Sequence, residues 1–308
     1  MKNRFIPRLL SFAVALAVLL GLSACHRDDT GTEPEPAGET PVPLSLQFDF
    51  SSVFTPYDAT RNDPDPYPLL FRACIYKGVE PKATDAPVAS LNLTGLRGGM
   101  ASLIQPVELL PGTYTVLAWA HHGNLWDAAD FDRIALCSEG FFTEYRLAYH
   151  CRKTFTVTQE SEGAAFTMTP PMARLSIIAA DRGAAPGLYR CRIRYTQFYP
   201  TAFSLFSNEP VDSASGVEVL CSEVSPIPNS DDVEIGADYI LVNGHETTIP
   251  MRFEILDAAG VVVKGYDISA PLLRGRQTTI RGNFFTGQSS SGTSIDPSFD
   301  GEDYYVEL

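Results

Sequence analysis

Leu44-Ser45-Leu46-Gln47-Phe48-Asp49-Phe50 is the stretch that decides the fold. Its large apolar side chains alternate with polar ones, and this period of two predicts a β-strand with one buried face. Similar strand patterns recur along the chain, in the ranges 71–76, 113–120, 154–157, 174–180, 190–195, 248–256, 261–268, 278–285 and 304–308. The best helix candidate, 125–135, is long enough for only one or two turns. We therefore predict an all-β protein built from β-sandwiches.

Turn residues divide this pattern into hairpins and domains. Asp257-Ala258-Ala259-Gly260 joins two predicted strands and predicts a hairpin turn with glycine at a positive φ. A polar turn at 158–163 and Pro170-Pro171 indicate a boundary near the middle of the chain. We predict two tandem domains, 44–165 and 166–308, each long enough for a sandwich of about seven strands. The strand near Phe166–Met168 fits either domain.

The N-terminus has the pattern of an export signal. Basic residues precede an apolar run, Leu9–Leu20, and no acidic residue appears before Asp28. A helix of that length spans roughly 18 Å, short of the ~30 Å hydrocarbon core, which favours a signal peptide over a membrane span. Leu22-Ser23-Ala24-Cys25 matches the lipobox of bacterial lipoproteins. We predict a signal peptide over 1–24, cleavage between Ala24 and Cys25, and lipid on the Cys25 thiol.

The segment 25–43 reads as a flexible tether. After Cys25 it holds many acids and prolines and only one large aliphatic residue, Val42, so it cannot bury enough apolar area to fold. His26-Arg27-Asp28-Asp29 resembles the charged signal that sends some lipoproteins of gut and oral anaerobes to the outer face of the outer membrane. We expect a protein held in the outer membrane by its lipid and facing outward.

The amino-acid composition limits the kinds of partner and the possible disulfide bridges. The net charge is −14, and without the three basic residues of the signal 20 bases stand against 37 acids, or −17. Such a balance argues against nucleic acid as a partner. Besides Cys25 an odd number of cysteines remains, so not all can pair. A bridge between the nearest two, Cys137 and Cys151, and buried free thiols both stay open; the remaining cysteines are Cys74, Cys191 and Cys221.

The sequence contains no motif typical of an enzyme, such as G-x-S-x-G or H-E-x-x-H. Asp29-Thr30-Gly31 matches the aspartic-protease tripeptide but lies in the tether. His121 and His122 are adjacent in a predicted strand and therefore point to opposite faces. We interpret two acidic groups as solvated turns: Asp58, Asp63 and Asp65, and Asp296, Asp300, Glu302 and Asp303. We predict a non-enzymatic protein with no metal and no cofactor beyond the covalent lipid.

Three further segments carry a family resemblance: Leu110–Tyr114 running on to Trp119-Ala120, the strand 172–181, and the ending 272–286 with Ile295–Gly301. They resemble segments of the fimbrillin-like lipoproteins of type V pili. The resemblance implies two transthyretin-like β-sandwich domains. It also implies a pilus subunit that supports adhesion and assembles with other subunits by β-strand complementation.

The resemblance gives Arg61 a special meaning. Stalk subunits of that family are cut after an arginine downstream of the lipid-bearing cysteine, and they lose their first strand with the lipid. A cut at Arg61 would release 44–50 in this way. We favour the interpretation of Arg61 as an ordinary loop charge, and we therefore expect an anchor or accessory subunit that keeps its lipid. The last strand, 304–308, either completes its own sheet or is donated to a neighbour.

Aromatic side chains support an alternative function, an outward-facing lipoprotein of the outer membrane that binds glycans. Trp119, Trp126 and Tyr114 are the residues with which it would stack on sugars. Trp119 lies in an apolar strand and is expected in the core. Trp126, beside Asp127, is the more exposed candidate.

Overall fold

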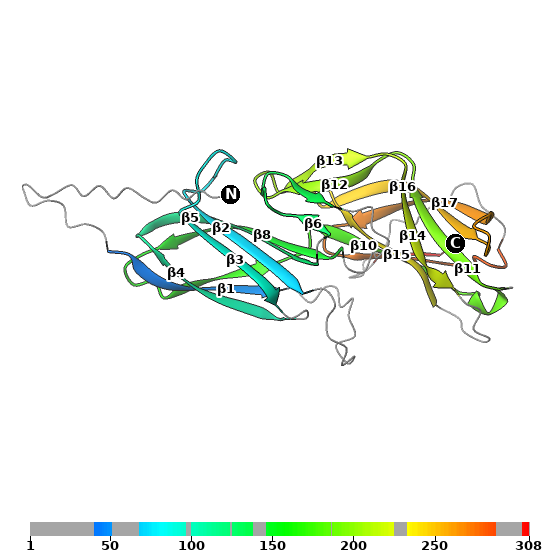
Figure 1. Ribbon diagram of the computed structural model, residues 1–308, viewed down its shortest axis with the longest axis horizontal. Helices are drawn as coiled ribbons and strands as arrows, with labels where there is room; N and C mark the ends of the chain where they lie inside the picture. Colours follow the sequence, from blue (N-terminus) through cyan, green and yellow to red (C-terminus); the bar gives the residue numbers. More distant parts are fainter. Residues whose placement is uncertain are drawn as a thin grey trace, which may run out of the picture. The chain divides into compact units, whose positions relative to one another are not determined.

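The computed structural model describes residues 40–50, 68–96, 100–123, 125–137, 146–185, 187–224, 233–287 and 304–307. Residues Glu39–Leu308 form one compact unit. Within the described ranges the chain forms strands and turns, with one short 3-10 helix, Arg182–Ala184, and no α-helix (Figure 1). The all-β prediction is confirmed.

The strands of the first half are β1 (Val42–Phe50), β2 (Leu69–Lys77), β3 (Ala89–Leu96), β4 (Ser102–Leu109), β5 (Gly112–His122), β6 (Trp126–Asp127), β7 (Ile134–Leu136), β8 (Ala148–Val157) and β9 (Gly163–Met168). Those of the second half are β10 (Met172–Ala179), β11 (Tyr189–Tyr195), β12 (Tyr199–Ser204), β13 (Glu209–Ala214), β14 (Val217–Val224), β15 (Val233–Leu241), β16 (Glu246–Leu256), β17 (Val262–Leu273), β18 (Gln277–Gly282) and β19 (Tyr304–Glu307).

The first half forms a sandwich from the sheets β4-β1-β9 and β3-β2-β5-β8. Alternation along β1 places Leu44, Leu46 and Phe48 in the core, with 4%, 0% and 0% of their surface exposed. The Phe48 ring packs on Phe71 of the facing sheet, with ring centroids 4.8 Å apart. The boundary predicted between 165 and 166 falls inside β9, whose register with β1 continues to Met168.

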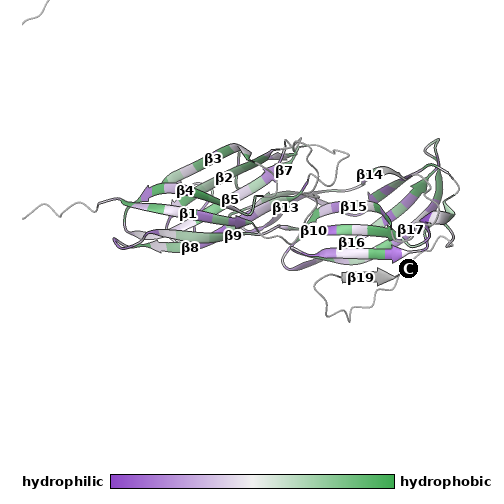
Figure 2. Ribbon diagram, turned by 90° about the horizontal axis from the view of Figure 1, so that it is seen from below, coloured by the Kyte–Doolittle hydropathy of each residue, from purple (hydrophilic) through white to green (hydrophobic). Residues whose placement is uncertain are grey.

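The second half repeats this arrangement with the sheets β15-β10-β18-β19 and β14-β11-β16-β17. β10 takes the place of β1, because it also runs antiparallel to one neighbour and parallel to the other. The hydropathy colours alternate along β10 and β16, as expected for strands with one buried face (Figure 2). The predicted hairpin between β16 and β17 is confirmed, with Gly260 at a φ of +79°.

A further sheet, β13-β12-β7-β6, joins the two halves. β6 and β7 come from the first half, β12 and β13 from the second, and β7 pairs with β12 through Ala135 and Ala202. The helix expected over 125–135 is therefore wrong. Trp126 and Ile134 bury their side chains in the core, and pairing with β12 replaces the local hydrogen bonds that a short helix would have made.

Candidate functional site

β1 holds a central place in its sheet. It pairs antiparallel with β4 from Val42 to Asp49 and parallel with β9 from Ser45 to Phe50. Its buried face fits between the two sheets, where Phe48 also packs on Phe166 at 5.2 Å between ring centroids. Without β1, the facing edges of β4 and β9 would lose their backbone partners along an apolar slot.

β19 has the opposite character, because it ends its sheet. It pairs parallel with β18 over four residues, Tyr304 to Glu307, and among the described residues no strand lies beyond it in the sheet. The sixteen residues 288–303 separate it from the described end of the preceding segment. A fully extended chain of that length spans at most roughly 55 Å.

The structure does not test the predicted processing sites. Ala24, Cys25 and Arg61 lie outside the described residues, as do Asp29-Thr30-Gly31 and both acidic groups. In the part of the chain that the structure describes, no three His, Cys, Asp or Glu side chains gather as metal ligands. The same part contains no helix long and apolar enough to cross a membrane.

The five described cysteines are free thiols, so no bridge joins Cys137 to Cys151. Burial raises the pKa of Cys151 to about 11. Cys137 is exposed, whereas Cys74, Cys151 and Cys191 are buried and Cys221 is half-buried. Of the two alternatives for Cys137 and Cys151, a disulfide bridge or free thiols, the structure has free thiols.

A buried ion pair links the two halves. Arg146 Nη1 donates to Asp238 Oδ1 at 2.8 Å, and the two side chains are 2% and 0% exposed. The Tyr195 hydroxyl donates to Asp238 Oδ2 at 2.8 Å, and the Asp238 carboxylate also accepts the backbone N–H of Tyr239. Burial raises the pKa of Asp238, while the contacts with Arg146 and Tyr195 oppose that rise. Because arginine keeps its proton in proteins, this network needs a charged carboxylate to balance it.

A second polar cluster lies where β8 meets the turn between β12 and β13. His150 Nδ1 is 2.8 Å from the Thr169 carbonyl oxygen, and Nε2 is 2.8 Å from the side-chain amide of Asn208. Asn208 has a φ of 62°, and its own carbonyl oxygen accepts hydrogen bonds from Arg274. Burial lowers the pKa of His150 to about 4 and that of His121 to about 4. Both rings are therefore neutral at pH 7.

These two imidazoles predict a loss of stability in mild acid. In the unfolded chain each takes up a proton near pH 6.5, but the folded protein resists protonation down to about pH 4. Above pH 6.5 protonation of these imidazoles does not affect the free energy of unfolding. As the pH drops to 4, the free energy of unfolding falls by up to roughly 3 kcal/mol per imidazole. Urea unfolding of the wild type and of His121→Asn at pH 7, 5.5 and 4 gives the slope of the free energy of unfolding against pH for each protein. We expect a smaller slope for His121→Asn. His245→Asn, at an exposed histidine, is the control; equal slopes in all three proteins would contradict the expectation.

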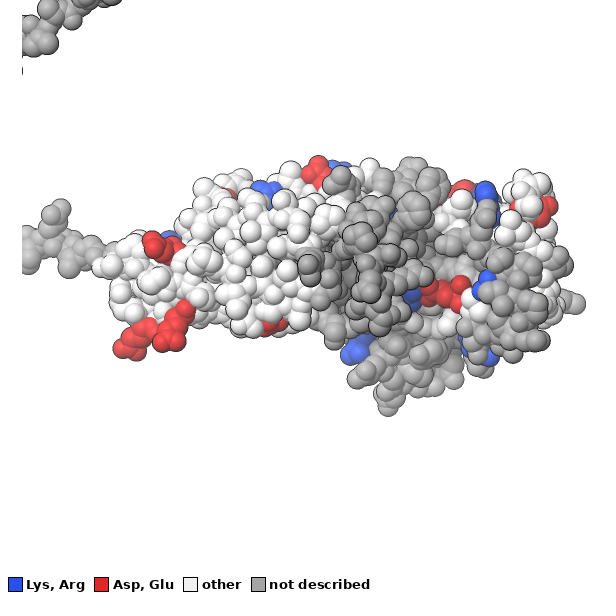
Figure 3. All heavy atoms as spheres, turned by 60° about the horizontal axis from the view of Figure 1, so that its bottom comes forward, with Lys and Arg blue, Asp and Glu red and all other residues white. Residues whose placement is uncertain are grey.

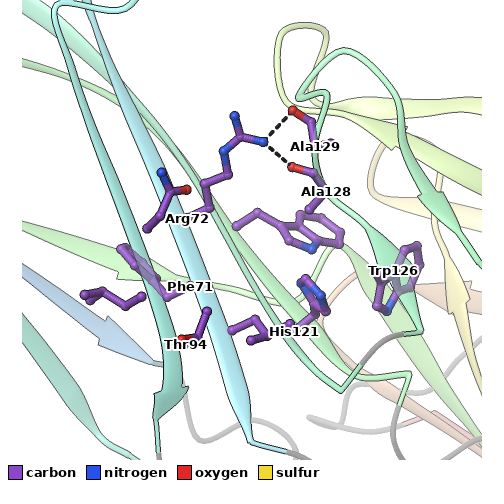
Figure 4. A pocket seen from close by; sticks show the side chains of 11 residues that line it. Phe71, Arg72, Thr94, His121, Trp126, Ala128 and Ala129 are labelled. Carbon is purple, nitrogen blue, oxygen red and sulfur yellow. Dashed lines mark hydrogen bonds between the residues drawn. The ribbon is translucent and has the colours of Figure 1, made fainter. Parts of the chain in front are cut away.

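A pocket of about 350 Å³ opens on the outer face of the sheet β3-β2-β5-β8, beside the sheet that joins the halves. Pairing places Arg72 opposite Trp119 on β5 and opposite Asn92 on β3, so these side chains share one face. The segment after β6 lines another side of the pocket with Ala128 and Ala129. Figure 4 shows the Arg72 guanidinium reaching these two residues, with His121 and Thr94 farther along the pocket.

The aromatic candidates lie deeper than a sugar-stacking surface requires. Trp119 is fully buried, as expected, and Tyr114 is also buried, with its hydroxyl donating to the Leu110 carbonyl. Trp126 is the more exposed of the two tryptophans, as predicted, but it is also buried. Its ring is 6% exposed, packs edge-on against Trp119 at 5.5 Å, and donates from Nε1 to the Arg146 carbonyl oxygen. Both tryptophans nevertheless line the pocket.

Charged side chains of both signs are mixed on the surface of the described residues. On the face drawn in Figure 3, lysines and arginines of the described residues stand singly or beside acidic side chains. Several arginines are engaged in ion pairs, for example Arg192 with Glu254 at 2.5 Å and Arg252 with Asp267 at 2.8 Å. In the part of this face that the structure describes, the positive charges are dispersed and do not form a continuous basic patch.

A family model matches most of the chain. The model of a family of unknown function, DUF6562, matches residues 36–307. No curated protein sequence matches the chain.

Solved structures with a similar fold include fimbrial proteins. The tip fimbrial protein Mfa3 of Porphyromonas gingivalis, with a C-terminal truncation, is 11% identical, with 78% of this chain and 94% of that chain covered and a TM-score of 0.47. A fimbrial assembly protein of Parabacteroides distasonis is 11% identical, with 79% and 91% covered and a TM-score of 0.43. The fimbrial anchor protein Mfa2 of Porphyromonas gingivalis is 9% identical, with 73% and 82% covered and a TM-score of 0.40. TM-scores below 0.5 are too low for a function to be transferred.

Proposed function

The chain belongs to DUF6562, a family of unknown function, and we propose that it is a non-enzymatic, lipid-anchored subunit of a type V-like pilus. In this role it is an anchor or accessory subunit at the outer membrane, and it supports adhesion. Its partners are other pilus subunits and the lipid of the outer membrane. The proposal rests on the chain's own strands and on the resemblance of its sequence segments.

The strand arrangement is the observation that carries the proposal. β1 fills a central slot, with Leu46 and Phe48 fully buried, whereas β19 only extends an edge. A strand at an edge is exchanged at lower cost than a central one, because fewer backbone bonds and buried side chains must be given up. We infer that β1 stays in place and that β19 is the strand offered to a neighbouring subunit.

The lipid completes the role. Signal cleavage between Ala24 and Cys25 leaves Cys25 as the lipid-bearing first residue, joined by the tether 25–43 to β1. With Arg61 uncut, the lipid stays covalently linked to the folded unit. Even a cut at Arg61 would leave β1 held by both β4 and β9, so the lipid-bearing segment would separate only after β1 is displaced.

Immunogold labelling and surface proteolysis of intact cells test the proposal. We expect label on filaments, protease access from outside, and filaments that stay with the membrane fraction. Cells that carry Cys25→Ser are the control, since loss of the lipid site should release labelled material from the membrane. Label spread evenly over the cell body, with no filament in cells with or without the gene, would overturn the pilus role.

The second candidate function is an outward-facing outer-membrane lipoprotein that binds glycans. The pocket lined by Trp119 and Trp126, rather than an exposed ring, would hold the sugar. The two functions predict different neighbours in the genome. Genes for pilin-like proteins beside this gene agree with the first, and genes for carbohydrate importers agree with the second.

A further inference from the structure

We propose that the pocket between β2, β3, β5 and the segment after β6 binds a small organic carboxylate, held by Arg72 and Trp119. An acidic sugar residue, such as a uronic acid, is one source of this chemistry, and a free organic acid of similar size is another. The inference does not depend on the pilus role, because it concerns a site on a single folded chain.

The pocket contains polar atoms that lack partners. Among the described residues, Arg72 Nε, Trp119 Nε1 and His121 Nδ1 are buried and accept or donate no hydrogen bond. All three residues line the pocket, and the side chains of Trp119 and His121 are 0% and 6% exposed. A buried polar atom without a partner is unfavourable, so three in one pocket indicate a ligand that supplies the missing bonds.

The hydrogen-bonding groups of the pocket limit the chemical class of ligand that it can bind. Arg72 Nε and Trp119 Nε1 are donors only, so both require an acceptor atom. The two residues stand directly opposite each other on adjacent strands, which brings both donors to one side of the sheet. His121 is neutral and can accept from or donate to a ligand hydroxyl through Nδ1. Two donors on one face of the sheet, one of them cationic, match the oxygens of a carboxylate.

The charge of Arg72 is also unbalanced. Among the described residues that line the pocket, only Arg72 carries a full charge, and its guanidinium contacts carbonyl oxygens and a ring, not a carboxylate. Its Nη1 donates to the carbonyl oxygens of Ala128, at 2.7 Å, and of Ala129, and its guanidinium lies 5.0 Å from the centre of the Phe131 ring. These contacts fix the guanidinium in place but leave Nε free, as a preorganised anion site requires.

The acidic residues near this segment are occupied elsewhere. Asp127 accepts the backbone N–H of Ala129, and Asp130 accepts that of Asp132. Neither lines the pocket. With a volume of about 350 Å³, the pocket is at the small end of the range of about 300–1,000 Å³ for ligand sites, which suits a single sugar ring or an organic acid of that size.

Isothermal titration of the full-length chain in detergent with D-glucuronate tests the proposal. We expect saturable binding at one site, at least tenfold tighter than that of D-glucose, which differs in having a hydroxymethyl group in place of the carboxylate. Arg72→Gln should weaken glucuronate binding about tenfold to a hundredfold, the range for a hydrogen bond to a charged group. Cyclohexanecarboxylate separates the two sources: equal affinity identifies an organic-acid site, and weaker binding identifies an acidic-sugar site.

Two further variants guard against indirect effects. Lys77→Gln removes one positive charge from the exposed end of the same strand and should leave binding unchanged. Thr94→Trp fills the pocket from the exposed edge strand β3 without touching the core, and should abolish binding even if Arg72→Gln folds poorly. Absence of glucuronate binding, equal affinity for glucose, or full binding by folded Arg72→Gln would each overturn the proposal.

Discussion

Replacing Arg146 by methionine is expected to lower the free energy of unfolding by about 3–5 kcal/mol. The change removes the positive partner of Asp238, whose carboxylate is fully buried, and leaves a charge without compensation in the interior. It also removes the hydrogen bond from Nη1 to the Tyr199 hydroxyl, at 2.7 Å. Urea denaturation at pH 7, followed by circular dichroism, measures the loss.

Two controls separate the buried charge from other effects. Arg146→Met combined with Asp238→Leu should recover much of the loss, since an apolar pair needs no charge balance. Arg133→Met breaks the pair with Asp212, whose side chains are 61% and 42% exposed, and should change the stability little. If Arg146→Met cost no more than Arg133→Met, the buried pair would not be the link between the halves that we describe.

The second large effect concerns β1. Phe48→Ala is expected to lower the free energy of unfolding by about 3–5 kcal/mol, because it leaves a cavity between Phe71 and Phe166 that the two sheets cannot close. Phe50→Ala is the matched control at the end of the same strand, where the side chain is only half-buried, and it should cost less. The same denaturation measurement applies to both variants.

The Phe48 result also bears on the pilus role. A strand that contributes this much buried area stays in its slot, in keeping with a subunit that retains β1 and its lipid. Equal and small losses for Phe48→Ala and Phe50→Ala would show that β1 is weakly held, and would favour a stalk subunit that loses the strand after a cut at Arg61.

Sequence periodicity predicted the strands whose alternate residues are large and apolar. β1 follows that pattern, because one of its faces is buried and the other is exposed or half-buried. β5 is buried on both faces from Tyr114 to His121, and its signal in the sequence is the continuous apolar run 116–120. β3 and β14 were missed, since both lie at sheet edges. The pattern of β3 contains Ser90, Asn92 and Thr94 between half-buried apolar residues, and its place depends on β2 rather than on its own side chains.

The sheet that joins the halves was beyond sequence reasoning. β7 and β12 pair although they are far apart in the sequence, and neither has a periodic pattern long enough to predict a strand. Asp238 did carry a signal, because a carboxylate within the apolar run up to Leu241 requires a partner. Nothing local pointed to Arg146, which lies 92 residues away.

The pocket was also only partly predictable from the sequence. Its tryptophans were recognised as candidates, but the acidic neighbour Asp127 suggested exposure for Trp126, whereas the carbonyl of Arg146 holds that ring inside. Arg72 alternates with apolar residues in β2 like many solvent-facing arginines. Its role emerges only from the strand register, which sets it opposite Trp119.

Photo-crosslinking on intact cells tests strand exchange most directly. A benzophenone amino acid at position 305 lies within β19, opposite Thr279 when the strand pairs in its own sheet. If β19 pairs in a neighbouring subunit, we expect crosslinks, identified by mass spectrometry, from position 305 to a second pilus subunit. Crosslinks found only within the same chain, around Thr279 of β18, would contradict strand exchange.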